Sequence, residues 1–181
     1  MSIQLFNMYQ EVDGDLVKLG LEGVFDVVVQ GNNCFCVQGA GLAPQFVKAF
    51  GTDRFVMERL EYKGNVNKLG TIDYELKSLS NPKGYRSVQM EGFESGKDLF
   101  VVNAYTQYNY GANHADGDKK PVDYEAITLV MRKINRIFAG KHVGLPYVIG
   151  AGLAGGDPSI IIDIIKRELK DVNVTMVKLN K

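Results

Sequence analysis

Glycines and small residues gather near the carboxyl end of the chain, directly before an aspartate and a proline. The run Gly150-Ala-Gly-Leu-Ala-Gly155 is followed by Gly156, Asp157 and Pro158. Glycines let the backbone adopt positive φ and approach a ligand closely, and a helix N-terminus offers unpaired N–H groups to an anion. Asp157 can cap such a helix, and proline suits its first position. The stretch therefore predicts a phosphate-binding loop that opens a helix.

A second run of the same kind lies earlier in the chain, at residues 39–41. It follows Phe25–Gln30, an apolar segment bounded by glycines that suits a strand buried on both faces. It precedes a short helix expected from about Leu42 to Phe50, with Gly51 as the natural stop. Both glycine runs are therefore expected between a strand and a helix.

The apolar pattern of the remaining chain predicts the elements that must position these loops. Strands are expected at residues 3–9, 25–30, 69–76, 85–90, 98–106, 147–149 and 172–179, and helices at 42–50, 53–60, 123–139 and after residue 157. Asp123 can cap the third helix, and Gly140 ends it. Strands that alternate with helices imply an α/β sheet with helices on both faces. The hairpin-like region 69–106 makes the predicted sheet mixed rather than all parallel.

Length and charge limit the class of protein. A chain of 181 residues is most simply one domain, spanning residues 1–181. Basic and acidic residues number 21 each, so no global field draws the chain to nucleic acid or to an anionic membrane. No apolar run approaches the roughly 20 residues that span a bilayer. We expect no membrane partner and no nucleic-acid partner.

The cysteines and the amino end bear on the compartment. Cys34 and Cys36 are the only cysteines, too close together for an ordinary disulfide framework, so reduced thiols are expected. Residues 1–10 lack the basic start and apolar run of a signal peptide. Together these features favour a cytoplasmic location. Zinc would need more ligands than His114 and His142 provide, so neither a metal nor a cofactor is expected.

Two other chemical interpretations are disfavoured. Residues 150–155 formally match the dinucleotide fingerprint, but that motif belongs in a first strand–helix unit, and only 26 residues follow Gly155. Cys34 has no histidine near it in sequence and nothing visible to lower its pKa, so we expect it to pack rather than react. His114 is expected to be an exposed loop residue.

Five motifs, in order, resemble those of the ADP-ribose-binding macrodomains. They are Gly14-Asp15-Leu16, Asp26-Val-Val-Val-Gln-Gly-Asn-Asn33, Gly39-Ala40-Gly41-Leu42-Ala43, the strand 101–105, and Gly150-Ala151-Gly152-Leu153-Ala154-Gly155. The resemblance covers most of the chain and implies a three-layer α/β/α macrodomain with a mixed central sheet. Two loops of backbone N–H groups also suit a diphosphate without a lysine cluster.

The resemblance implies a role for each motif. Asp15 would contact the adenine amino group, and Leu16 would contribute to the adenine pocket. Asn33 would position the distal ribose, and Tyr105 would help to wall the pocket. The loops would hold phosphates through backbone N–H groups, namely those of Gly39, Ala40, Gly41 and Leu42, and of Ala151, Gly152, Leu153, Ala154 and Gly155. The plain alternatives are that Asp15 and Asn33 are only turn residues.

The sequence of the second loop resembles the macrodomain branch that contains ADP-ribose-1″-phosphate phosphatases more than it resembles the common deacetylating and hydrolysing macrodomains. That branch also includes enzymes that remove ADP-ribose from acidic side chains, which have a lysine at the end of the central strand and an aspartate after the second glycine motif. This chain has Ala154 at the aspartate position and no lysine in residues 103–110. These departures disfavour that second activity.

The expected function is binding of ADP-ribose and hydrolysis of ADP-ribose 1″-phosphate to ADP-ribose and phosphate. Asp157 either caps its helix alone or also orients water or donates a proton during hydrolysis. Two alternatives stay open. One is a module that binds ADP-ribose without turnover, and the other is a hydrolase that acts on ADP-ribosylated macromolecules.

Overall fold

A computed structural model of the chain describes residues 8–84, 97–110, 122–147, 149 and 155–179. Six strands form one sheet, namely β1 (Tyr9–Asp13), β2 (Val27–Asn33), β3 (Ile72–Ser78), β4 (Asp98–Gln107), β5 (His142–Pro146) and β6 (Asn173–Lys178). The α-helices described are α1 (Leu16–Leu21), α2 (Ala43–Phe50), α3 (Tyr124–Ile137) and α4 (Pro158–Glu168). Short 3₁₀ turns, η1 (Thr52–Arg54), η2 (Val56–Glu58), η3 (Leu60–Tyr62) and η4 (Val66–Lys68), connect α2 to β3.

The sheet is mixed, as the sequence predicts. Its strand order is β1-β6-β5-β2-β4-β3, and every neighbouring pair is parallel except β3 with β4. The chain leaves β2 through α2 to β3 and then β4 on one side, and it leaves β5 through α4 to β6 on the other. The order therefore reverses between β5 and β2, which is where open α/β sheets place their ligands, beyond the carboxyl ends of the strands.

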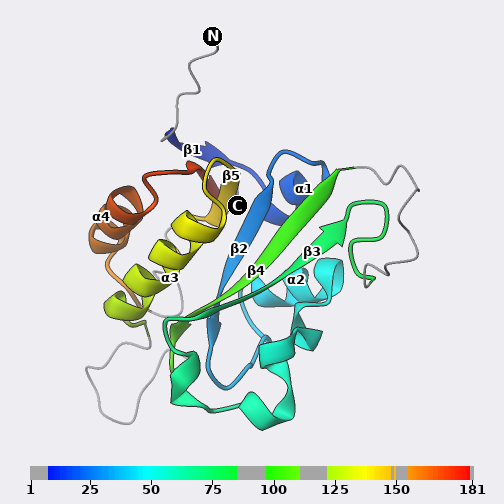
Figure 1. Cartoon of the computed structure of the whole chain (residues 1–181), viewed down its shortest axis with the longest axis vertical. Helices are drawn as coiled ribbons and strands as arrows, with labels where there is room; N and C mark the ends of the chain where they lie inside the picture. Colours follow the sequence, from blue (N-terminus) through cyan, green and yellow to red (C-terminus); the bar gives the residue numbers. More distant parts are fainter. Residues whose placement is uncertain (1–7, 85–96, 111–121, 148, 150–154, 180–181) are drawn as a thin grey trace.

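Helices cover both faces of the sheet and create two cores (Figure 1). On one face, α3 and α4 pack against side chains such as Val29 and Val102. On the other face, α1, α2 and Phe55 pack against Val28 and Val101. Successive strand residues point to opposite faces, so the apolar runs of β2 and β4 supply both cores.

Helix ends follow the local signals closely. Asp123 caps α3 by accepting from the Ala126 N–H at 2.9 Å, and Gly51 ends α2 with φ of 66°. Pro158 is the first residue of α4, directly after the Asp157 cap. These predictions are confirmed. The sequence could predict them because each cap depends on residues within one helical turn of the terminus.

Three expected elements lie elsewhere or take another form. The strand before the second glycine loop is His142–Pro146, not 147–149, and Tyr147 already lies in a turn. The first strand among the described residues is Tyr9–Asp13, whereas most of the strand expected at 3–9 and the whole strand expected at 85–90 lie outside the described residues. The helix expected at 53–60 is a series of 3₁₀ turns, because Phe55 and Arg59 adopt extended backbone angles that interrupt it.

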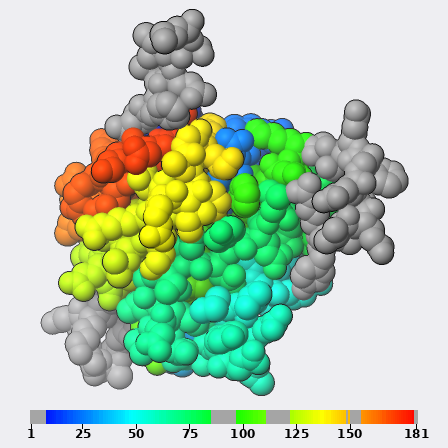
Figure 2. All heavy atoms as spheres, viewed as in Figure 1, coloured from blue at the N-terminus to red at the C-terminus, as the bar shows by residue number. Residues whose placement is uncertain are grey.

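The 3₁₀ turns occupy the lower end of the molecule in Figures 1 and 2. Individual buried side chains, rather than one apolar helix face, hold this segment against the sheet. Phe55 is fully buried, and Glu58 is 5% exposed. The Met57 N–H donates to Asp73 of β3 at 2.8 Å, which fixes η2 to the sheet edge. Within the described ranges, the helices are too short or too polar to cross a bilayer.

Candidate ligand-binding site

Five parallel strands end at one edge of the sheet, and the candidate site is built there. β1 ends at Asp13, β2 at Asn33, β4 at Gln107, β5 at Pro146 and β6 at Lys178. The Gly14 N–H donates to the Lys178 carbonyl at 2.8 Å, so the chain stays attached to β6 as it leaves β1. The motif that contains Asp15 therefore lies at the same edge as the end of β2.

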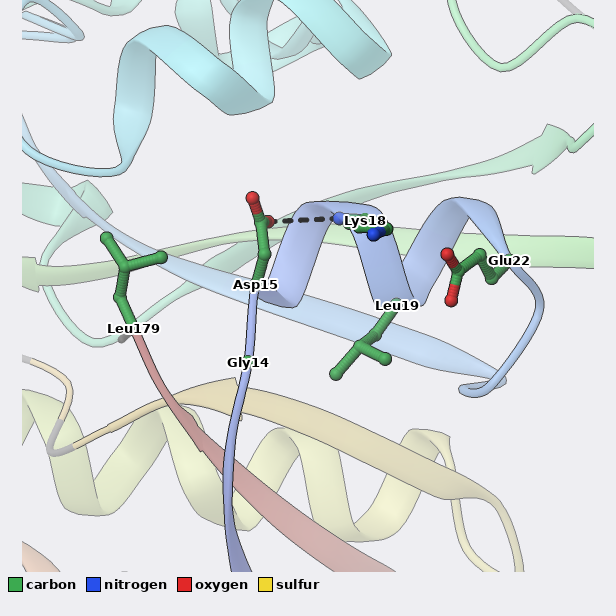
Figure 3. Close-up of a pocket in the computed structure, with 6 residues that line it drawn as sticks. All are labelled: Gly14, Asp15, Lys18, Leu19, Glu22 and Leu179. Atoms are coloured by element: carbon green, nitrogen blue, oxygen red, sulfur yellow. Dashed lines mark hydrogen bonds between the residues drawn. The ribbon is translucent and has the colours of Figure 1, made fainter. Parts of the chain in front are cut away.

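A pocket of about 350 Å³ opens beside the first turn of α1 (Figure 3). It is lined by Gly14, Asp15, Lys18, Leu19, Glu22 and Leu179. Asp15 caps α1 because its Oδ1 accepts from the Lys18 N–H at 3.0 Å. Figure 3 shows Asp15 between Leu179, which follows β6, and Leu19 of α1. The pocket thus brings the Asp15 carboxylate beside the apolar side chains of Leu19 and Leu179, and the charged residues Lys18 and Glu22 complete its lining.

The Leu16 side chain is not among the pocket walls. It is 4% exposed and packs in the core with α2 and β2. The apolar side chains that line the pocket are those of Leu19 and Leu179, which were not predicted from the sequence, and the contribution of Leu16 to an adenine pocket stays a prediction. Leu19 lies four residues after Asp15 and would have followed from a predicted helix here. Leu179 would not, because only the β1–β6 pairing brings it near.

The first glycine loop is open to solvent and leads into α2. Residues 39–41 are exposed, and Gly41 has φ of 64°. A Cβ built on Gly39 or Gly41 meets no described atom within 4 Å. Leu42 occupies the N-cap position of α2 and makes no side-chain cap hydrogen bond in the described structure. This helix start can therefore offer backbone N–H groups to an anion.

Asn33 shapes the loop that precedes these glycines. Its Nδ2 donates to the Val37 carbonyl at 2.9 Å, and its Oδ1 accepts from the Val37 N–H at 3.1 Å. Gln38 is held in turn by the Thr52 hydroxyl, which donates to its Oε1 at 2.8 Å. These bonds fix the loop between β2 and residue 39. The contact of Asn33 with a distal ribose stays a prediction.

Tyr105 lies in the interior rather than at the pocket of Figure 3. Its side chain is fully buried, and its hydroxyl donates to Glu58 Oε1 at 2.6 Å. Asn32 and Asn103 donate to the same oxygen at 3.2 and 3.5 Å. Burial and the Glu58 carboxylate raise the pKa of Tyr105 far above its usual value. A ligand contact by Tyr105 would require this network to open.

The second glycine loop is described only at its ends. Residues Ala151, Gly152, Leu153 and Ala154 lie outside the described residues. Ile149 is buried, and a Cβ on Gly31 of β2 would lie 3.1 Å from its Cγ1. The chain therefore enters the second loop against the end of β2, close to where the first loop begins. Gly155 resumes the described chain with φ of 69°.

Asp157 is an exposed N-cap at the start of α4. Its Oδ1 accepts from the Ser159 N–H at 2.9 Å and from the Ser159 hydroxyl at 2.8 Å. Its own N–H donates to the Tyr124 hydroxyl at 2.9 Å, which joins the start of α4 to the start of α3. The predicted cap is confirmed. A catalytic role for Asp157 stays a prediction.

The remaining candidates behave as the sequence suggests or lie outside the described residues. Cys34 is fully buried, and burial raises the pKa of its thiol to about 11, so little thiolate exists near neutral pH. His114 lies outside the described residues. His142 is at the amino end of β5, opposite the edge that forms the site.

Comparison with known proteins was made by sequence and by structure. No protein-family model matches the chain. The uncharacterized 17.5 kDa protein of the tk-vs intergenic region of Enterobacteria phage T4 is 28% identical over 171 residues, covering 92% of this chain and 93% of that protein. The macrodomain of Mycobacterium tuberculosis DarG is 18% identical, with a TM-score of 0.63, and the match covers 97% of this chain and 99% of that one.

Two further solved structures share this architecture. The macrodomain of Thermus aquaticus DarG is 19% identical with a TM-score of 0.62, over 96% of this chain and 98% of that one. Thermosipho africanus DarTG, solved in complex with ADP-ribose, is 17% identical with a TM-score of 0.61, over 99% of this chain and 43% of that one. At these identities the likeness concerns the fold. Strand order, helix placement and these neighbours agree that the chain has the macrodomain fold.

Proposed function

We propose that the chain binds ADP-ribose at the carboxyl edge of its sheet. The observation that supports this most directly is the pocket beside Asp15, which lies at the same edge as the open glycine loop at 39–41. A carboxylate beside the apolar side chains of Leu19 and Leu179 suits a planar base with an exocyclic amine. Thermosipho africanus DarTG, part of which has a similar fold, was solved in complex with ADP-ribose.

The two glycine loops would hold the phosphates of this ligand. The exposed backbone of Gly39 and Gly41 lets a diphosphate approach closely, and the N-terminus of α2 faces it with positive dipole charge. Gly155 and the N-terminus of α4 would serve a second phosphate in the same way. A chain with balanced charge can bind this anion because the contacts come from oriented N–H groups.

We further propose hydrolysis of ADP-ribose 1″-phosphate. Water would attack the terminal phosphorus, the bond from phosphorus to the 1″ oxygen would break, and ADP-ribose and inorganic phosphate would leave. Asp157 would orient the water or supply a proton to the leaving oxygen. Its exposure at the start of α4, two residues after Gly155, supports this role. Asn33 would act by positioning the distal ribose.

The test is phosphate release from ADP-ribose 1″-phosphate by the wild-type chain and by Asp157→Asn. Asparagine caps helices about as well as aspartate, so the variant removes the charge and keeps the fold. We expect phosphate release to fall about a hundredfold, the size of one general acid or base contribution. Unchanged release by the folded variant would remove Asp157 from the mechanism.

Binding without turnover is the second candidate. It is favoured by the two hydrogen bonds that Asp157 Oδ1 already accepts from Ser159, because capping alone accounts for that oxygen. This candidate predicts that the wild-type chain binds ADP-ribose but releases no phosphate. The same two assays therefore separate the candidates.

A further inference from the structure

Behind the first glycine loop lies a group of side chains that the proposed reaction does not use. Cys36 lies in the loop after β2, Lys68 ends η4, and Glu58 ends η2. Lys68 is 1% exposed and Glu58 is 5% exposed, whereas Cys36 is half-buried. A buried amine, a buried carboxylate and the thiol of a half-buried cysteine thus meet at one place.

Lys68 is held directly against the Cys36 sulfur. Its Nζ lies 2.6 Å from Cys36 Sγ and 2.5 Å from the Met57 carbonyl oxygen. The same nitrogen lies 4.5 Å from the centre of the Tyr105 ring. These contacts come from three separate segments and hold a lysine side chain that is 1% exposed. The nitrogen is therefore pre-positioned on the sulfur.

The loop also turns the sulfur inward. Cys36 has φ of 60°, and it is the one non-glycine residue with positive φ among those the structure describes. This conformation is uncommon for a side chain with a Cβ. Cys36 Sγ lies 3.4 Å from the Met57 carbonyl oxygen, the same atom that Lys68 contacts. Two independent contacts therefore fix the Cys36–Lys68 pair.

We propose that Cys36 and Lys68 form a reversible covalent cross-link when the protein meets a peroxide. In the first step the Cys36 thiolate attacks one peroxide oxygen, the O–O bond breaks, and a sulfenic acid forms. The sulfur loses two electrons and the peroxide gains them, leaving as hydroxide when it is hydrogen peroxide. This step needs no other reactant.

In the second step the Lys68 amine, its ammonium proton released to water, attacks the sulfenic sulfur. An S–N bond forms, and the sulfenic oxygen leaves as water with one proton from the nitrogen. A thiol reductant reverses the link, because it attacks the sulfur and releases the amine. Contact at 2.6 Å lets the amine capture the sulfenic acid before a second oxidation.

The acid–base state of Cys36 sets the rate. Burial raises the pKa of the Cys36 thiol, and the hydrogen bond and charge of Lys68 oppose that rise. The thiolate fraction therefore grows with pH above neutrality, and so does the rate of linking. Cys34 is the competing thiol, but it is fully buried with a pKa raised to about 11.

The experiment treats the full chain with hydrogen peroxide, digests it with trypsin and maps the peptides by mass spectrometry. We expect a linked pair in which Lys68 is not cleaved by trypsin, lighter by two hydrogen atoms than the Cys36 peptide plus the peptide that runs through an uncleaved Lys68. The link should disappear after treatment with dithiothreitol and should form faster as pH rises. Because the wild-type map alone decides the question, no variant is required to fold.

Matched variants identify the partners. Cys36→Ser and Lys68→Arg should abolish the linked pair, since arginine keeps the charge but lacks a nucleophilic amine, and Cys34→Ser should retain it. Unlinked sulfinic acid at Cys36, a disulfide between Cys34 and Cys36, or a linked pair that keeps the oxygen would each contradict the proposal. None of these outcomes depends on ADP-ribose binding.

Discussion

At the scale of single residues, two aspartates each cap a helix and are each also proposed to act on the ligand. Asp15 caps α1, and Asp157 caps α4, each through its Oδ1. A carboxylate has two oxygens, so capping does not exhaust its capacity to accept hydrogen bonds. Substitution by asparagine separates the duties, because asparagine caps a helix but has no negative charge.

Asp15→Asn should fold as the wild type does and bind ADP-ribose weakly. The asparagine oxygen stays committed to the Lys18 N–H, so its amino group would face the exocyclic amine of the ligand, donor against donor. We expect the dissociation constant to rise at least about tenfold. Calorimetry of ligand binding, with urea unfolding of both proteins, measures the two effects.

The control for this prediction is Asp15→Ala, which removes the cap as well. It should lose about 1 kcal/mol of unfolding free energy in addition to the binding defect. If Asp15→Asn binds ADP-ribose as tightly as the wild type, Asp15 is only a cap.

At the scale of elements, the first glycine loop offers a pair of matched positions. Gly39 and Gly41 both face open space, but only Gly41 has positive φ. An alanine at Gly41 strains the backbone even without a ligand, whereas an alanine at Gly39 adds one methyl group that meets no described atom. The pair therefore separates backbone strain from ligand approach.

Gly39→Ala should leave the unfolding free energy unchanged and weaken ADP-ribose binding, because the methyl group occupies the path of the diphosphate. Gly41→Ala should also lose about 1 to 3 kcal/mol of stability. Chemical denaturation and calorimetry of both variants provide the readout. Full binding by the folded Gly39→Ala variant would place the diphosphate away from this loop.

The amino end of β5 makes stability depend on pH. Burial lowers the pKa of His142, although Asp26 nearby favours the charged form, and its Nε2 pairs with the Thr175 hydroxyl at 2.8 Å. The unfolded chain, with a histidine pKa of about 6.5, then binds more protons than the folded chain as pH falls. The folded protein therefore keeps its full stability above about pH 6.5, where His142 is neutral in both states, and loses stability below that pH.

We therefore expect wild type to lose stability relative to His142→Gln between about pH 7.5 and about pH 5.5. Urea unfolding of both proteins across this range measures the difference, and comparison cancels the carboxyl groups that titrate in both. If the stability of wild type relative to His142→Gln stays constant with pH, or rises as pH falls, His142 is not neutral in the fold.

Local signals explain which elements could be predicted. The caps at Asp123 and Asp157 and the stop at Gly51 need only neighbouring residues. The helix α1 was missed because it has six residues and depends on packing against β2 and α2. The 3₁₀ turns at 52–68 were missed because Phe55 and Glu58 are held by distant partners. The same limit applies to the Asn33–Val37 bonds and to the burial of Tyr105.

At the scale of the whole molecule, the site depends on a sheet packed tightly on both faces. A Cβ on Gly144 of β5 would lie 2.7 Å from Cδ2 of the buried Phe25 ring. Phe25 precedes β2, so this contact joins the two strands between which the order reverses. The sequence did not predict this contact, because the two residues lie 119 positions apart (144 − 25).

Gly144→Ala should lower the unfolding free energy by about 2 kcal/mol through overpacking. Phe25→Leu in the same chain should recover part of this loss, although Phe25→Leu alone destabilises the wild type. Urea unfolding of the two single variants and the double variant measures the coupling. If the losses of unfolding free energy in the two single variants add up in the double variant, the Phe25 ring does not clash with an alanine at position 144.

The central claim is that this fold binds ADP-ribose at the carboxyl edge of its sheet. Calorimetric titration with ADP-ribose tests it most directly, using the wild-type chain beside the folded variants Asp15→Asn and Gly39→Ala. We predict saturable binding of one ligand per chain by the wild type and weaker binding by both variants. Absence of binding by the folded wild type at millimolar ADP-ribose would contradict it.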